Sequence, residues 1–158
     1  HALEVVGFVI SLHIIGMYAL SPLVGRVADR LGARPVIAAG GVLLAVGAAF
    51  AAGSEATESG GVYLGLFLIG LGWCCGLVAG STLLVRTFAG SDRVGIQGLA
   101  DLCMTASGGL AGLGSGFMVA VAGYQNLSRA GIVVGLIPTV AVLAMLLSDR
   151  GRHRPQAA

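Results

Sequence analysis

The chain has 158 residues, of which 56% are hydrophobic and 10% are charged, with a formal net charge of +2. A soluble domain carries about a quarter charged residues, so this chain has too little polar surface to cover itself in water. The mean hydropathy of +0.94 excludes an ordinary soluble domain and indicates a protein that lies in a lipid bilayer. All nine basic residues are arginine, and Gly and Ala are abundant, which suggests a GC-rich bacterial coding sequence.

Long apolar runs, separated by charged or turn-forming residues, divide the sequence into membrane-length segments. A helix needs about 20 mainly apolar residues to cross a hydrocarbon core of about 30 Å. Such runs predict five spanning helices, over residues 3–24, 35–52, 62–85, 94–122 and 129–147. We therefore predict an all-α polytopic membrane bundle over residues 1–149, followed by a polar tail over residues 150–158.

Arginine is distributed unevenly over the predicted connections. Eight of the nine arginines lie after the first span, after the third span or in the tail, whereas Arg129 lies on the other side. The positive-inside rule places the arginine-rich side in the cytoplasm. We expect a multi-pass protein of the bacterial inner (plasma) membrane, with the C-terminal tail in the cytoplasm.

The first span carries an ionisable residue near its midpoint, His13. An imidazole titrates near neutral pH, so His13 is a candidate proton or substrate group. The alternative is a neutral histidine that forms a hydrogen bond to a neighbouring helix.

The segment between the first two spans gathers charge and glycine at an ordered spacing, in Gly25, Ala28, Asp29, Arg30, Gly32 and Arg34. We expect a short loop in which Gly25 allows close approach to a neighbouring helix and Gly32 allows a tight turn. Asp29 suits the positive N-terminal end of another helix. Pro35 fits the first turn of the next helix, because its missing N–H would have no partner there. A charge cluster that merely fixes topology is the alternative.

Glycines recur along the second and third spans. Gly40 and Gly47 share one face of the second span, and the third span carries Gly65, Gly72, Gly76 and Gly80 on one face. Small residues four positions apart let helix backbones approach closely in lipid. We predict helix packing as their role, with a hinge as the alternative.

The fourth span carries a stripe of polar and small residues at steps of three or four, formed by Gln97, Asp101, Thr105, Gly108, Gly112 and Ser115. Asp101 lies about two helical turns inside the membrane. An ionisable residue at such depth normally faces protein or a water-filled cavity. Gln97 and Asp101 are therefore candidate proton or substrate groups. A carboxylate that is hydrogen-bonded to its neighbours near the interface is the alternative.

The three cysteines, Cys74, Cys75 and Cys103, match no metal or redox spacing. The sequence also contains no nucleophile motif and no pair of residues suited to acid and base catalysis at a membrane interface. We therefore expect no enzymatic activity, no metal and no cofactor.

The charged segment resembles the signature loop of the major facilitator superfamily, a large group of secondary transporters. That loop reads glycine, two variable residues, a small residue, aspartate, arginine, a variable residue, glycine and basic residues. Gly25 to Arg34 matches this order, with Ala33 where a basic residue is common. Further similarity, to the C-terminal half of bacterial members, lies at His13, Gly16, Met17, Gly72, Trp73, Thr82, Leu83, Leu84, Arg93, Val94, Gln97, Gly98 and Asp101. The resemblance covers essentially the whole chain.

This resemblance implies that the five spans are helices eight to twelve of a twelve-helix fold. Helices two to six are the alternative, because the two halves are repeats. It further implies secondary active transport of a small solute by alternating access, often driven by protons.

The resemblance also implies a role for the signature segment as a conformational latch, in which Asp29 meets the N-terminal end of the fifth helix. That helix belongs to the N-terminal half of such a transporter. We expect this half, the lipid bilayer and a small solute as partners, and no nucleic acid.

Five spans are less than one transporter, so a second function class stays open. The chain begins at His1 rather than Met, and we expect it to be a fragment of a longer protein. The alternative is a non-transporting membrane subunit or a degenerate transporter remnant. About seven further apolar spans upstream would support the transporter, whereas an immediate start codon would support the subunit.

Overall fold

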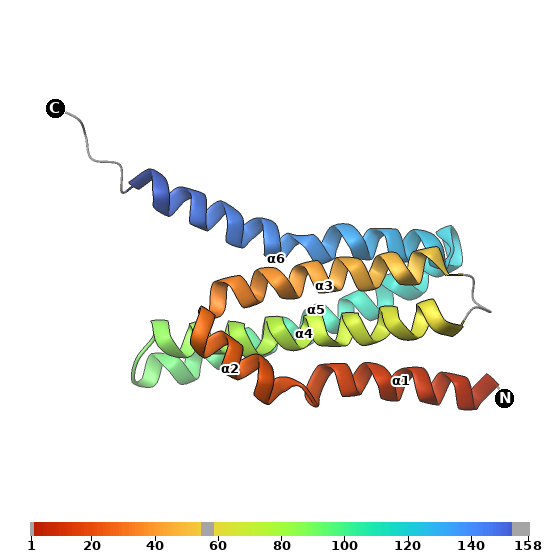
Figure 1. Cartoon of the computed structure of the whole chain (residues 1–158), viewed down its shortest axis with the longest axis horizontal. Coiled ribbons are helices and arrows are strands. Elements are labelled where there is room, and N and C mark those ends of the chain that lie inside the picture. The colour runs from red at the N-terminus through yellow and green to blue at the C-terminus, as the bar shows by residue number, and fades with distance from the viewer. Residues whose placement is uncertain (1, 55–58, 153–158) are drawn as a thin grey trace.

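The computed structural model describes residues 2–54 and 59–152. This part of the chain forms six helices and no strand: α1 (Ala2–Tyr18), α2 (Ser21–Leu31), α3 (Ala33–Gly53), α4 (Ser59–Thr87), α5 (Ser91–Ala122) and α6 (Tyr124–Arg152). The long helices lie side by side and alternate in direction (Figure 1). Together α1 and α2 form one apolar segment, so five segments are long and apolar enough to cross a membrane. The predicted all-α bundle of five spans is confirmed.

The first span bends where α1 gives way to α2. Pro22 lies in the first turn of α2 and has no N–H to offer the carbonyl of Tyr18, four residues earlier. The Ser21 hydroxyl donates to that carbonyl instead, at 2.8 Å. The helix therefore breaks at residues 19–20 without leaving the Tyr18 carbonyl unpaired.

The charged segment is mostly helical, and the prediction of a loop there is wrong. The helix α2 includes Gly25, Asp29 and Arg30 and ends at Leu31. It is amphipathic, because Val24 and Ala28 are buried in the core beside Cys74 and Ala79 of α4, whereas its charged side chains are exposed. The burial of this apolar face keeps the charged residues helical.

Two glycines of this segment behave differently. Gly32 separates α2 from α3 and has φ of +92°, a conformation that L side chains rarely adopt, so the predicted tight turn is confirmed. A methyl group at Gly25 would lie 3.9 Å from Val78 Cγ1. That is ordinary van der Waals contact, so Gly25 does not mark a close backbone approach, contrary to expectation. Pro35 lies in the first turn of α3, as predicted.

The helices α3 and α4 pack backbone to backbone through a glycine seam, formed by Gly40, Gly47, Gly65 and Gly72. A methyl group added at Gly40 would lie 2.8 Å from the Gly72 carbonyl oxygen, and one at Gly47 would lie 2.6 Å from the Gly65 carbonyl oxygen. Both distances are shorter than real Cβ contacts allow. The packing role that we predicted for these four glycines is confirmed.

Similar contacts attach α1 and α6 to this central pair. A methyl group at Gly16 of α1 would lie 2.6 Å from the Phe67 carbonyl oxygen of α4. A methyl group at Gly135 of α6 would lie 2.9 Å from the Ala45 nitrogen of α3. The Thr139 hydroxyl also donates to the Ala38 carbonyl at 2.7 Å. Small residues thus set the spacing of four helices.

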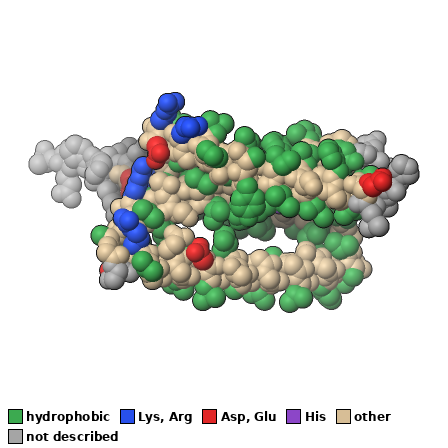
Figure 2. Space-filling view, turned by 90° about the horizontal axis from the view of Figure 1, so that it is seen from below, with side chains coloured by type: hydrophobic (Ala, Val, Ile, Leu, Met, Phe, Trp, Pro, Cys, Tyr) green, Lys and Arg blue, Asp and Glu red, His purple; other side chains and the backbone are tan. Residues whose placement is uncertain are grey.

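In contrast, α5 packs loosely on the other helices. None of the most apolar stretch of α5 is buried, and large side chains such as Leu110, Leu113 and Phe117 are more than 70% exposed. A hollow separates this helix from the rest of the molecule over much of its length (Figure 2). At about 1.5 Å per residue, its 32 residues span about 48 Å, which exceeds a hydrocarbon core of about 30 Å. A helix of this length can tilt in the membrane or begin in its interface.

The connections between the last helices are shorter than predicted. Between α5 and α6 only Gly123 is non-helical, with φ of +81°, and Gly90 precedes α5 with φ of +62°. The segment 124–128, which we expected in a loop, is the first part of α6. At the other end α6 continues to Arg152 and thus includes the first residues of the predicted tail. Residues 153–158 lie outside the described part.

The glycine seam can be tested with two neighbouring glycines of α4. We predict that Gly72→Ala destabilises the protein by about 1–3 kcal/mol, because the added methyl overpacks the contact with α3. Gly76→Ala serves as the control, since no atom lies within 4 Å of its added methyl and alanine favours a helix over glycine by about 1 kcal/mol. Thermal unfolding of the full-length protein in detergent measures both. Equal unfolding midpoints for the two variants would contradict close backbone packing at the glycine seam.

Candidate functional site

A cleft of about 310 Å³ lies between α4 and α5. Its lining is mainly apolar and includes Trp73, Leu77, Leu84 and Met104, with Ser81, Gln97 and Asp101 as polar side chains. Pockets of about 300–1,000 Å³ with apolar walls and a few placed polar groups are typical of small-molecule sites. The cleft is therefore the candidate site of this chain.

Gln97 and Asp101 are one helical turn apart on α5, and the structure brings both into the cleft. The Gln97 amide Nε2 donates to the Asp101 carboxylate Oδ1 at 3.1 Å. The other end of the amide, Oε1, is buried and accepts no hydrogen bond from the protein. An unpaired buried acceptor costs about 1–3 kcal/mol. Such an atom indicates a place that a hydrogen-bond donor can fill.

The floor of the cleft depends on two glycines that do not belong to the seam. Gly76 and Gly80 line the cleft, and a methyl group added at either would meet no atom within 4 Å. The packing role that we predicted for these two glycines is wrong, because α5 stays too far from α4 for backbone contact. They leave open volume instead.

The structure does not place His13 among the residues that line the cleft. Its Nδ1 lies 2.8 Å from the Leu66 carbonyl oxygen of α4. Since a carbonyl accepts, the ring donates from Nδ1. This contact matches the alternative that we kept for His13, a histidine hydrogen-bonded between helices. A role of His13 in proton transfer stays a prediction.

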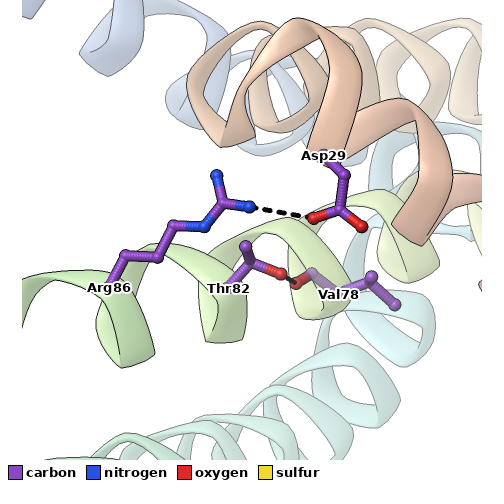
Figure 3. Close-up of polar contacts among 4 residues, drawn as sticks. All are labelled: Asp29, Val78, Thr82 and Arg86. Carbon is purple, nitrogen blue, oxygen red and sulfur yellow. Dashed lines mark hydrogen bonds and ion pairs between the residues drawn. The ribbon is translucent and has the colours of Figure 1, made fainter.

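The signature segment contributes an ion pair at the arginine-rich end. The Arg86 guanidinium of α4 donates to the Asp29 carboxylate of α2 at 2.9 Å. Figure 3 shows the two side chains pointing toward one another, while the Thr82 hydroxyl turns back to the Val78 carbonyl of its own helix. The sequence reasoning did not name Arg86 as a partner. The sequence places Arg86 at the end of the third span, but its distance from Asp29 depends on how the helices pack.

Further arginines hold helix ends at the same side of the molecule. Arg34 at the start of α3 pairs with Asp149 near the end of α6 at 2.9 Å. Arg93 donates to the carbonyls of Val85 at 3.0 Å and Phe88 at 3.4 Å, which lie at or just beyond the C-terminal end of α4. Figure 2 shows arginine side chains gathered at this end. The charges tie α2 to α4 and α3 to α6.

Residues 2–54 and 59–152 contain no group of three His, Cys, Asp or Glu side chains placed to hold a metal ion. Cys74 and Cys75 are buried and Cys103 is exposed, all three as free thiols.

The fold and the cleft together define a polytopic helical membrane protein with a small-molecule-sized site between two of its spans. The family model of the Major Facilitator Superfamily matches residues 1–158. The chain belongs to this superfamily, as the signature segment indicated.

Two relatives come from Bacillus subtilis strain 168. The chain is 40% identical to the uncharacterized MFS-type transporter YddS over 87% of its own length and 31% of that protein. It is 36% identical to the uncharacterized MFS-type transporter YdeG over 96% of its length and 34% of that protein. The riboflavin transporter RfnT of Brucella anthropi is 24% identical over the whole chain and 38% of its own length. The chain thus spans about a third of these curated relatives, and no solved structure matches.

The ion pair between Asp29 and Arg86 can be tested by a double-mutant cycle. Both side chains are more than half exposed, so we predict a coupling energy of about 0.2–1 kcal/mol. Asp29→Asn, Arg86→Gln and the double variant are compared by thermal unfolding in detergent. The exchange of charges in Asp29→Arg with Arg86→Asp should recover part of the loss. If the destabilisation of the double variant equals the sum of the two single effects, Asp29 and Arg86 do not interact.

Proposed function

We propose that this chain forms part of a secondary active transporter that moves a small solute across the bacterial plasma membrane by alternating access. The observation that carries the proposal is the cleft between α4 and α5, where a carboxylate and an amide face a mainly apolar space within apolar spans. Asp101 lies about 15 Å along the helix axis from Ser91. Solute and coupling-ion sites of such transporters lie near the bilayer midplane. Membership of the superfamily and the transporter names of the relatives support the same function.

The arginine-rich end is the cytoplasmic end in this proposal. Arg34, Arg86 and Arg93 lie at this end, whereas Arg129 lies near the start of α6, at the opposite end of the bundle. The positive-inside rule then places the end of α6 and the C-terminal tail in the cytoplasm. The connection between α5 and α6 faces outward.

Asp101 is the proposed proton-carrying group. It is the one residue with an acidic or basic side chain among those that line the cleft. Its carboxylate accepts from the neutral Gln97 amide, so a proton or a cation can neutralise it when the cleft opens to water. Intramembrane carboxylates of this kind form proton relays in transporters. His13 stays a second candidate, although its ring already donates to α4.

The signature segment is the proposed latch. The pair of Asp29 with Arg86 and the pair of Arg34 with Asp149 hold the cytoplasmic ends of four helices in one arrangement. Both pairs are exposed and therefore weak, so a second arrangement of the same charges costs little. In the full-length protein Asp29 meets the N-terminal end of a helix of the other half when this side closes.

The test of this proposal is uptake by the full-length protein in proteoliposomes under an imposed pH gradient. A panel of small solutes, with riboflavin included because of the relative RfnT, identifies a transported compound. We predict that Asp101→Asn lowers proton-driven uptake by about tenfold or more.

Asp92→Asn is the matched control. It removes the same charge from the first turn of the same helix and should leave uptake unchanged. Proton-driven uptake that survives in Asp101→Asn would remove Asp101 from the mechanism. Failure of every solute to move under any gradient would contradict transport.

A further inference from the structure

We propose that the cleft between α4 and α5 binds a small organic cation, an amine or guanidinium attached to an apolar or aromatic body. The inference rests on the proposed function, because it names the class of solute that the same cleft accepts. Three observations carry it: an uncompensated negative charge, hydrogen-bond acceptors with spare capacity and an aromatic wall.

The negative charge of Asp101 has no positive partner within the cleft. The arginines of the two helices that form the cleft are directed elsewhere. Arg86 pairs with Asp29, and Arg93 donates to the carbonyls of Val85 and Phe88. Because Asp101 lies on an apolar span, its uncompensated charge attracts a cation in the cleft. An anionic solute would be repelled for the same reason.

Two hydrogen-bond acceptors of the cleft keep capacity for a donor. Gln97 uses its Nε2 to donate to Asp101, and its Oε1 is left buried without a donor. The Asp101 carboxylate accepts this one bond and keeps capacity for more, since an ionised carboxylate has about four acceptor sites. An ammonium brings three donors and a guanidinium five. A neutral ether or ester brings none and would leave Oε1 unpaired.

Trp73 supplies the aromatic wall of the same cleft. Its ring is held in place by Tyr18 of the first span, with ring centroids 5.8 Å apart in an edge-to-face arrangement. The face of a tryptophan ring attracts organic cations, by about 0.5–2 kcal/mol for side-chain cations in general. Leu77 and Met104 complete an apolar lining that suits the body of an amphiphilic cation rather than an inorganic ion.

The experiment measures binding, not transport, so it can fail independently of the proposed function. The full-length protein in detergent is titrated by calorimetry with three probes of matched body and different charge: phenethylammonium, 2-phenylethanol and 3-phenylpropionate. We expect phenethylammonium to bind at least about tenfold more tightly than the other two. Asp101→Asn should weaken its binding by at least about tenfold. Asp92→Asn should leave it unchanged.

Two variants at Gln97 separate a loss of binding from a loss of folding. Gln97→Glu adds a negative charge beside Asp101 and should tighten phenethylammonium binding, while Gln97→Met should weaken it. A fold defect would weaken both alike. Binding that prefers 2-phenylethanol or 3-phenylpropionate, or no binding of phenethylammonium at millimolar concentration, would overturn the inference. Proton-driven uptake of a neutral solute through an intact Asp101 would overturn it too, while leaving the proposed function in place.

Discussion

The contact on which the rest of this structure depends is the backbone approach of α3 and α4 at the glycine seam. Each of the four seam glycines would place an added methyl group within 2.8 Å of an atom of the opposite helix. In lipid no hydrophobic force drives helices together, so close packing of small residues must supply the association. Because α4 also receives α1 at Gly16 and Gly70, it packs closely against two helices, while α6 packs on α3. The side of α4 that faces α5 is therefore the side left available for a cleft.

Two parts of α4 differ in their contacts, the face toward α5 and the arginine-rich end. On the side toward α5, a methyl group added at Gly76 or Gly80 would meet no atom within 4 Å, and this open volume adjoins the Gln97–Asp101 pair. At the arginine-rich end, Arg86 ties α4 to the signature segment through Asp29. The proposed latch acts at this end, where a movement that opens the cleft would displace the Arg86 end of α4. Exposed pairs suit that proposed role, because each contributes about 1 kcal/mol or less and can exchange partners.

The sequence predicted the spans well, because apolar length is a property of each segment by itself. It also placed Gln97 and Asp101 on one stripe of the fourth span, since residues four positions apart are neighbours on a helix. Features that depend on how helices pack were not predictable in this way. The signature segment became helical because Val24 and Ala28 find a surface on α4, and Arg86 met Asp29 through the same packing. Trp73 and Ser81 line the cleft because of the same packing. Helix packing also explains why Gly72 lies in a close contact, whereas Gly76 borders open space. Whether a glycine packs or leaves space depends on the distance to the next helix.

The most direct test of this account compares two thiols on α4. In a full-length background without other cysteines, Ser81→Cys places a thiol in the cleft, whereas native Cys74, retained alone, has 0% exposure in the core. The measurement is the rate of reaction with a water-soluble, membrane-impermeant methanethiosulfonate. The account predicts that the thiol at position 81 reacts much faster than Cys74 and is protected by a bound solute. Equal reactivity of the two thiols, or an inert thiol at position 81, would contradict a solvent-accessible cleft on one side of α4 and a closed core on the other.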